Sequence, residues 1–325
     1  MTVFLDFLMV IVGFVCLIKG ADFLVDSASS IAKKLNISEL VIGLTIVALG
    51  TSAPEMVVNG ISAAKGHDEV VFGNIIGSNI FNLFLILGVA GLIYPLSVRG
   101  NTVWKEIPFS LGVSVFLFLL VNDQLLWGND YNTAGKFDGV FLIGLFVAFI
   151  LYIAFNLRKD KDRNELVDEH EIKIFSYTKT ILMMVGGIAA LAIGGNLVVT
   201  NAVALAQKFE VSEKLIGLTI ISAGTSLPEL ATTVIAATKK KSDIAVGNVL
   251  GSNILNITLI LGISALIRPL NYNVLLNTDM YVLFGGTLLL FFFMFTLHSK
   301  KLDRWEAFIY VVGFIGYLVF LFIRK

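Results

Sequence analysis

Residues 50–55, Gly-Thr-Ser-Ala-Pro-Glu, place a carboxylate, two hydroxyls and a proline inside an apolar run long enough to cross a membrane. The stretch recurs at residues 224–229 as Gly-Thr-Ser-Leu-Pro-Glu. An ionisable side chain in a bilayer is costly and marks a functional site by default. The proline leaves the carbonyl four residues earlier, that of Gly50 or Gly224, without its helical partner. Because freed backbone survives at membrane depth only where it is buried in protein or lines a cavity, we expect two broken helices that face each other around a cation.

Polar side chains accompany each glutamate at helical spacing. Positions three or four apart share a helix face, so each glutamate should lie beside the two hydroxyl residues that precede it. These are Thr51 and Ser52 before Glu55, and Thr225 and Ser226 before Glu229. The following spans carry a second stripe, also duplicated: Asn74, Ser78 and Asn82, then Asn248, Ser252 and Asn256. Carboxylate, hydroxyl, amide and carbonyl oxygens suit hard cations such as Ca²⁺, Mg²⁺, Na⁺ or K⁺, and disfavour Zn²⁺ or Cu⁺.

Charge narrows the possible partners of the chain. Two carboxylates balance one divalent cation and would repel each other if left alone, so a cation or protons should occupy the site throughout the cycle. The formal net charge of the chain is zero, which gives no indication of nucleic-acid binding. The lone cysteine, Cys16, excludes a disulfide framework or a thiolate metal site. No histidine or lysine that could activate Ser52 or Ser226 as a nucleophile stands beside them in the spans. We therefore expect that the protein is not an enzyme, and we expect no cofactor.

The composition is typical of a polytopic membrane protein. The 325 residues are 57% hydrophobic and have a mean hydropathy of +0.87. A bilayer-spanning helix needs ~20 apolar residues, which leaves room for about ten spans. The expected spans are 3–33, 38–64, 71–93, 104–121, 137–157, 174–206, 213–237, 244–266, 277–297 and 304–323. We therefore predict an all-α membrane protein with ten transmembrane helices, the second and seventh of which are broken at the midplane.

An internal repeat decides the expected architecture. Residues 20–96 align without a gap to residues 194–270, with 35 of 77 pairs identical. Glu55 falls in the second span and Glu229 in the seventh, and an odd number of crossings separates them. The two halves must therefore insert upside down relative to each other, which is the inverted-repeat plan of secondary transporters with a binding site at the midplane. We expect a first five-helix repeat over 1–157, a linker over 158–173 and a second repeat over 174–325.

Lysine and arginine residues orient this arrangement in the membrane. With the N-terminus outside, the inside loops carry sixteen of the 24 basic residues, and the outside loops with the C-terminus carry seven. The positive-inside rule then places both termini outside and the 158–173 loop in the cytoplasm. We expect a multi-pass protein of the plasma membrane that works as a monomer in the lipid bilayer.

Three local features also carry expectations. Ser38-Glu39 and Ser212-Glu213 stand at span beginnings and predict helix N-caps followed by an acid that complements the helix dipole. Lys19, Asp22 and Asp26 in the first span predict an ion pair at i,i+3 spacing near a water-filled entry. The glycine pairs 73/77 and 247/251 predict close helix approach.

The duplicated motifs resemble those of a known family. Gly-Thr-Ser-x-Pro-Glu occurs in both halves, and each copy is followed by Gly-Asn-x-x-Gly-Ser-Asn-Ile-x-Asn. This pattern is similar to the two α-repeats of the cation/calcium exchanger superfamily. Within that superfamily it most resembles the pattern of the prokaryotic sodium/calcium exchangers. The resemblance covers all ten expected spans. It implies a secondary antiporter that exchanges Na⁺ for Ca²⁺, with several Na⁺ per Ca²⁺.

The resemblance also implies roles for particular residues. Glu55 and Glu229 would hold Ca²⁺ together with the carbonyls of Thr51 and Thr225. The flanking Na⁺ sites would use Ser52, Ser78, Ser226 and Ser252 with the backbone carbonyls of Ala48 and Ser222. Asn82 would belong to the central region, and Asn256 stands where some relatives have aspartate.

Other transport reactions stay open at this point. The amide at Asn256 weakens the case for K⁺-dependent exchange, since K⁺-dependent relatives resemble one another in having an aspartate at this position. Proton-coupled relatives have a different motif around the glutamate, which weakens H⁺/Ca²⁺ exchange; Mg²⁺ could also take the place of Ca²⁺. A passive cation channel could use the same oxygen ligands, although broken helices in inverted repeats suit alternating access better.

Overall fold

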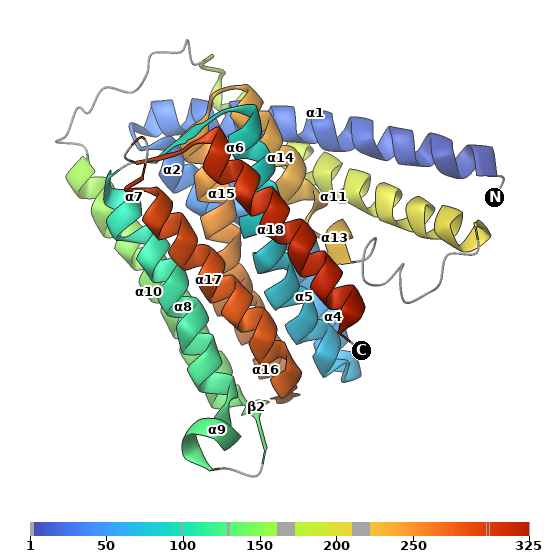
Figure 1. The fold of residues 1–325 in the computed structure, drawn as a ribbon. Coiled ribbons are helices and arrows are strands. Elements are labelled where there is room, and N and C mark those ends of the chain that lie inside the picture. Colours follow the sequence, from blue (N-terminus) through green and yellow to red (C-terminus); the bar gives the residue numbers. More distant parts are fainter. Residues whose placement is uncertain are drawn as a thin grey trace.

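The protein is a bundle of long helices, shown in Figure 1 in a computed structural model. The structure describes residues 3–98, 100–128, 131–160, 173–209, 222–296, 298 and 300–324. Within these ranges eight helices are long and apolar enough to cross a membrane, and a bent helix pair makes a ninth candidate span. The seventh predicted span, 213–237, begins in the stretch 210–221, which lies outside the described residues. The predicted count of ten therefore stays a prediction.

The described helices follow the expected spans to within four residues. The first half contains α1 (Val3–Leu35), α2 (Glu39–Ile42), the π-helical segment η1 (Gly43–Val47), α3 (Ala48–Thr51), α4 (Ala53–Lys65), α5 (Asp68–Ile80), the π-helical segment η2 (Phe81–Ile86), α6 (Leu87–Ile93), α7 (Gly100–Trp104), α8 (Glu106–Val121), α9 (Asp123–Trp127) and α10 (Lys136–Asp160). The second contains α11 (Tyr177–Lys208), α13 (Ser222–Gly224), α14 (Leu227–Thr238), α15 (Ser242–Leu255), the π-helical segment η4 (Asn256–Ile260), α16 (Leu261–Ile267), the 3₁₀ turn η5 (Val274–Leu276), α17 (Asn277–Phe293) and α18 (Arg304–Ile323).

The second span is broken at Ser52. Its two parts, Glu39–Thr51 and Ala53–Lys65, meet at an angle of 49°. Ser52 ends α3 with a backbone ψ of 8°, and Pro54 occupies the first turn of α4, where its missing N–H costs no helical hydrogen bond. The second half repeats this geometry: Ser226 has ψ 8° and Pro228 lies in the first turn of α14. Each duplicated motif thus forms a helix break followed by a new helix N-terminus.

Two spans lie at the centre of the bundle. The spans Asp68–Ile93 and Ser242–Ile267 are 72% and 78% buried, against 22–39% for the other six. They run in opposite directions, since α6 and α15 lie toward one end of the molecule in Figure 1 and α5 and α16 toward the other. Both contain a π-helical segment at equivalent positions, a feature often found at functional sites. The two broken helices pack against these central spans.

Glycines allow the closest helix crossings. A Cβ at Gly251 would lie 2.7 Å from the Leu44 carbonyl oxygen, and one at Gly247 would lie 2.8 Å from that of Leu40, so the predicted close approach at 247/251 is present. No described atom lies within 4 Å of a Cβ built at Gly73 or Gly77. The residues equivalent to Leu40 and Leu44 in the internal repeat lie outside the described residues, so the close approach at 73/77 stays a prediction.

A second glycine-mediated crossing joins α1 to α11. A Cβ at Gly20 would lie 2.8 Å from the Gly187 carbonyl oxygen, and one at Gly194 would lie 2.7 Å from that of Gly13. The two helices therefore pack backbone against backbone, and Figure 1 shows them side by side at an oblique angle to the remaining bundle.

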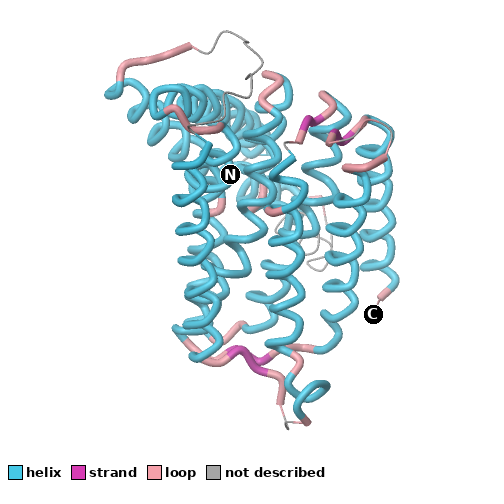
Figure 2. The backbone as a smooth tube through the Cα atoms, turned by 90° about the vertical axis from the view of Figure 1, so that its left-hand side faces the viewer, coloured by secondary structure: helices cyan, strands magenta, loops and turns pink. Residues whose placement is uncertain are grey.

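Two short antiparallel ribbons close opposite ends of the bundle (Figure 2). Strand β1 (Leu96–Ser97) pairs with β4 (Lys301–Leu302), and β2 (Thr133–Ala134) pairs with β3 (Leu270–Asn271). Leu96 and Leu270 occupy equivalent positions of the internal repeat. Because equivalent segments close opposite ends, the two halves have inverted orientations, as the sequence predicts.

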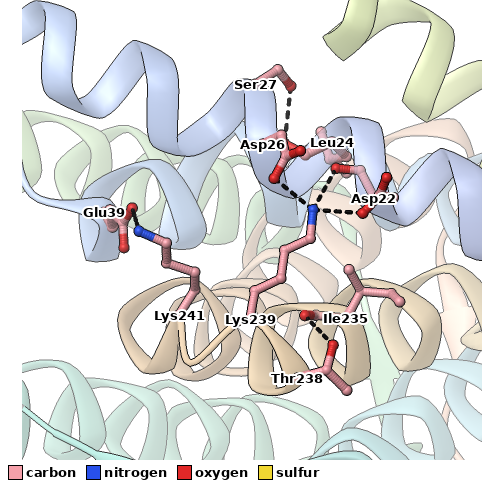
Figure 3. Close-up of polar contacts among 9 residues, drawn as sticks. All are labelled: Asp22, Leu24, Asp26, Ser27, Glu39, Ile235, Thr238, Lys239 and Lys241. Carbon is pink, nitrogen blue, oxygen red and sulfur yellow. Dashed lines mark hydrogen bonds and ion pairs between the residues drawn. The ribbon is translucent and has the colours of Figure 1, made fainter. Parts of the chain in front are cut away.

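A lysine turn attaches the end of α14 to α1 and α2 (Figure 3). Lys239 Nζ lies 2.5 Å from carboxylate oxygens of both Asp22 and Asp26, and Lys241 Nζ lies 3.0 Å from Glu39 Oε1. The predicted i,i+3 pair with Lys19 is wrong, because Lys19 is exposed and the carboxylate of Asp22 pairs with α14 instead. The sequence of α1 alone could not reveal a partner that lies more than two hundred residues away.

The helix N-cap predicted at Ser38 is confirmed. Its side chain accepts a hydrogen bond from the Val41 N–H at 3.4 Å, and Glu39 lies in the first turn of α2. The corresponding Ser212-Glu213 lies outside the described residues.

Candidate functional site

The duplicated motifs meet in the interior of the bundle. Glu55 and Glu229 are each 1% exposed, and both lie in the first helical turn after a break. A carboxylate at a helix N-terminus is favoured by the helix dipole, so the two breaks supply local stabilisation for otherwise costly buried acids. Since the halves are inverted, the N-termini of α4 and α14 both present an acid to the same region.

Each glutamate accepts a hydrogen bond from the other half. Ser52 Oγ donates to Glu229 Oε1 at 2.8 Å, and Ser226 Oγ donates to Glu55 Oε1 at 3.2 Å. The serines of the central spans complete the pattern, since Ser252 Oγ lies 3.0 Å from Ser52 Oγ and Ser78 Oγ lies 3.1 Å from Ser226 Oγ. The structure thus brings together the two acids and four of the predicted hydroxyl ligands.

Four oxygen atoms of the site are buried without a hydrogen-bond partner among the described residues. They are Glu55 Oε2, Glu229 Oε2, Asn82 Oδ1 and Asn256 Oδ1. They form two equivalent pairs under the internal repeat. A buried acceptor without a partner costs free energy, and carboxylate and amide oxygens can only accept or coordinate. These atoms therefore match the donor set of a hard cation.

Two further asparagines, Asn79 and Asn253, hold the amides of this donor set. The Nδ2 of each donates to the backbone carbonyl of the other, at 3.1 and 3.2 Å. Asn82 Nδ2 donates to Asn253 Oδ1 at 3.1 Å, and Asn256 Nδ2 donates to Asn79 Oδ1 at 3.0 Å. With both nitrogens engaged, the amide oxygens of Asn82 and Asn256 are left for a ligand. Sequence reasoning missed Asn79 and Asn253, although both are identical between the repeats within Gly-Ser-Asn-Ile.

The threonines of the motifs pair with amides of the opposite half. Thr51 Oγ1 donates to Asn248 Oδ1 at 3.1 Å, and Asn74 Nδ2 donates to Thr225 Oγ1 at 3.2 Å. These contacts fix the Thr51 and Thr225 side chains beside the helix breaks. They direct both hydroxyls toward the opposite half, whereas helical spacing predicts a place beside the glutamate of the same motif.

The predicted backbone ligand at Ala48 has partners of its own. Its carbonyl oxygen accepts from the Ser52 N–H at 3.0 Å, and the Thr51 hydroxyl oxygen lies 3.3 Å away. A carbonyl oxygen has two lone pairs, so Ala48 keeps limited capacity for a cation. Its counterpart Ser222 is the first described residue of α13, and its side chain lies outside the description.

A cavity of about 790 Å³ reaches the site and is lined by residues of both halves. It is lined by Asn74, Thr225 and both motif prolines, Pro54 and Pro228, whereas Thr51 and Asn248 are buried at 0% exposure. In the described part of the chain, Asn74 and Thr225 thus border the cavity and their counterparts do not. No group of three or more His, Cys, Asp or Glu residues that could hold a metal occurs there, so two acids and neutral oxygens make up this donor set.

Comparison with known proteins agrees with this geometry. The family model described as "Sodium/calcium exchanger protein" matches residues 5–155 and 179–323. CaxA of Alkalimonas amylolytica is 38% identical over 318 residues, which cover 96% of this chain and 97% of that protein. The sodium/calcium exchanger MaX1 of Methanosarcina acetivorans is 33% identical over 346 residues, with 98% of each chain covered.

A solved structure shares the fold. The sodium-calcium exchanger NCX_Mj, soaked with Na⁺ and Sr²⁺, superposes with a TM-score of 0.83 at 29% identity, covering 98% of this chain and 99% of that one. Fold, motifs and relatives therefore lead to one assignment. The chain is a multi-pass membrane protein that belongs to the sodium/calcium exchanger protein family.

Proposed function

We propose that this protein is a secondary antiporter that exchanges Na⁺ for Ca²⁺ by alternating access, with Glu55 and Glu229 as the shared cation-binding carboxylates. The observation that carries the proposal is the cross-half pairing of each glutamate with a serine, which leaves one oxygen of each carboxylate without a hydrogen-bond partner among the described residues. Two acids offset the charge of one Ca²⁺, and the surrounding neutral oxygens suit either ion.

The two cations use overlapping ligands in this proposal. Ca²⁺ takes both carboxylates with the backbone carbonyls of Thr51 and Thr225. Na⁺ takes the flanking hydroxyls of Ser52, Ser78, Ser226 and Ser252, with the carbonyls of Ala48 and Ser222. Asn82 and Asn256 complete the centre. Because both loads draw on the same two negative charges, full occupancy by both would leave strong repulsion between cations a few ångströms apart. The ions are therefore exchanged in alternation.

Alternating access is supported by the inversion of the two halves around one shared site (Figure 2). In an inverted-repeat transporter, movement of one repeat against the other opens such a site first to one side of the membrane and then to the other. The repeats extend over 1–157 and 174–325 with the cytoplasmic linker 158–173 between them. The protein works as a monomer in the plasma membrane with both termini outside.

Ca²⁺ flux into vesicles that contain the purified protein tests the proposal. Gradients of Na⁺, K⁺ and H⁺ are imposed one at a time, with protein-free vesicles as the control. A Na⁺ gradient should drive Ca²⁺ against its own gradient, which a passive channel cannot do. Uphill Ca²⁺ movement driven by H⁺ alone, or dependent on added K⁺, would replace this proposal with the corresponding exchanger.

A further inference from the structure

Two buried positions behind the site break the symmetry between the halves. Asn59 on α4 and Thr233 on α14 are equivalent in the internal repeat, and both are 0% exposed. We propose that Asn59 and Thr233 are positioning residues that turn the amides of Asn74 and Asn248 in opposite directions and so give Thr51 and Thr225 different roles toward the cation. The inference rests on the proposed function, because it concerns ligands of the same site.

In the first half, a backbone carbonyl sets the direction of the chain of hydrogen bonds. Asn59 Nδ2 donates to the Glu55 carbonyl oxygen at 2.8 Å, and a carbonyl can only accept. The same nitrogen donates to Asn74 Oδ1 at 2.7 Å. Since Asn74 presents its oxygen to Asn59, its nitrogen faces Thr225 and donates to Oγ1 at 3.2 Å. Thr225 is therefore an acceptor in this contact.

In the second half, the amide is reversed. Asn248 Nδ2 donates to Thr233 Oγ1 at 3.0 Å and to the Glu229 carbonyl oxygen at 3.4 Å. The carbonyl again requires the nitrogen at this position, so Asn248 Oδ1 faces Thr51. The Thr51 hydroxyl must then supply the hydrogen, and it donates at 3.1 Å. Thr51 is a donor where its counterpart Thr225 is an acceptor.

This reversal changes what each hydroxyl offers to a cation. A hydroxyl has one hydrogen and two lone pairs. Thr51 uses its hydrogen on Asn248, or on the Ala48 carbonyl oxygen 3.3 Å away, and keeps both lone pairs for a ligand. Thr225 has one lone pair occupied by Asn74, and its hydrogen is available to turn into the site. The Thr51 hydroxyl is thus the better oxygen donor of the pair. The proposal adds it to the serine hydroxyls that hold Na⁺, so Na⁺ should depend on Thr51 more than on Thr225.

Packing does not account for asparagine at position 59. Its Oδ1 is buried and has no hydrogen-bond partner within the described ranges, which costs stability. A threonine, as at the equivalent Thr233, would leave no such amide oxygen. What asparagine adds is the donated N–H that fixes the orientation of Asn74, so the cost is explained if orientation is its role.

The exchange of the two residues tests the inference. Thr51→Val and Thr225→Val are made in the wild type and in the double variant Asn59→Thr/Thr233→Asn, and the Na⁺ concentration for half-maximal Ca²⁺ flux is measured. In the wild type, Thr51→Val should raise this concentration roughly 2- to 10-fold more than Thr225→Val, the range of one neutral hydrogen bond. In the double variant the ranking should reverse, with maximal flux changing less than the half-saturating concentration.

Controls separate positioning from folding. Thr233→Ser keeps the hydroxyl and should keep the wild-type ranking. If the double variant does not fold, Asn59→Thr alone should make the two threonine substitutions equal in effect. Equal effects of Thr51→Val and Thr225→Val in the wild type would overturn the inference. So would the wild-type ranking in the folded double variant or in folded Asn59→Thr.

A second measurement distinguishes failure of this inference from failure of the proposed function. The same ranking is measured as thermal stabilisation of the purified protein by Na⁺, K⁺ and Ca²⁺, each added alone as the chloride. A wild-type protein that moves no Ca²⁺ with Na⁺ rejects the proposed function. The ranking of the threonine variants in cation-dependent stabilisation still decides whether Asn59 and Thr233 set the asymmetry.

Discussion

Ser52 of the first half donates a hydrogen bond to Glu229 of the second, with 2.8 Å between Ser52 Oγ and Glu229 Oε1. The equivalent contact runs the other way, from Ser226 to Glu55. Each helix break therefore supplies the hydroxyl that orients the carboxylate of the opposite break. A site of this kind exists only when both halves are in place. A change in the serine of one half alters the hydrogen bonding of the carboxylate in the other.

Removal of either central charge should abolish exchange. Glu55→Gln and Glu229→Gln keep the size of the side chain but replace a carboxylate with an amide. Loss of one partner from a buried charge pair costs ~3–5 kcal/mol, so Ca²⁺ flux into vesicles should fall by roughly 100-fold or more. Unfolding is not expected, because the amide oxygen can still accept from the facing serine.

Glu106→Gln is the matched control for these variants. Glu106 is also a buried glutamate of a span, at 6% exposure, but it lies on α8 and accepts from the Tyr152 hydroxyl at 2.8 Å. Its amide variant should retain exchange. Wild-type flux in Glu55→Gln or Glu229→Gln would remove these residues from the mechanism.

Na⁺ and Ca²⁺ should compete for the site. Since the two loads share Glu55 and Glu229, the Ca²⁺ concentration for half-maximal flux should rise with Na⁺ on the same side, while maximal flux stays constant. Titration of flux against both ions checks this, and a non-competitive pattern would contradict a shared site. If more than two Na⁺ move per Ca²⁺, exchange carries charge, and voltage should bias it by ~2.3 kcal/mol per elementary charge per 100 mV.

The equivalent turns after α4 and α14 should face opposite sides of the membrane. Lys65 and Lys240 are both exposed, and the turns follow helices of inverted direction. Cysteines introduced at these positions, in a Cys16→Ser background, should react with an impermeant maleimide from opposite sides of sealed cells. Lys65 is expected to label from outside. Labelling of both positions from the same side would exclude the inverted arrangement.

The lysine turn should contribute modestly to stability. Lys239→Gln leaves Asp22 and Asp26 without their shared cation. Each pair is partly exposed and worth ~0.2–1 kcal/mol, so the free energy of unfolding should fall by about 0.5–2 kcal/mol at low salt. High salt should reduce the difference by screening.

Lys240→Gln is the control, since this side chain lies on the same turn and is exposed. It should leave the unfolding midpoint unchanged. An unfolding midpoint of Lys239→Gln equal to that of Lys240→Gln at every ionic strength would show that the ion pairs are energetically neutral.

Much of the fold could be predicted because the same sequence pattern occurs in both halves of the chain. Apolar runs gave the described spans, and the duplicated prolines predicted the breaks at Ser52 and Ser226. The gapless repeat predicted the inversion, which the ribbons at Leu96 and Leu270 confirm. The acids and serines that meet in the interior were also identified from the motifs, although their roles as cation ligands stay predictions.

What the sequence did not reveal depends on partners far along the chain. Spacing within α1 predicts a partner for Asp22 one helical turn away, yet Asp22 pairs with Lys239 because α14 ends against α1. Helical spacing from Ser78 and Ser252 selects Asn82 and Asn256, and so leaves out Asn79 and Asn253. Their role appears only when the two central spans cross and each amide meets the backbone of the other. Spacing within one helix cannot show such a crossing.

The ribbons at the two ends of the bundle have a consequence for biosynthesis. Each ribbon pairs a strand translated early with one translated late. Strand β1 pairs with Lys301–Leu302, and strand β2 pairs with Leu270–Asn271. As the chain leaves the ribosome, the first five spans enter the membrane long before either closure can form. The newly made half must therefore persist in the bilayer as an open intermediate. Its Glu55 lacks the Ser226 partner until that residue has been translated, and the β1–β4 ribbon stays open until residues 301–302 have been translated.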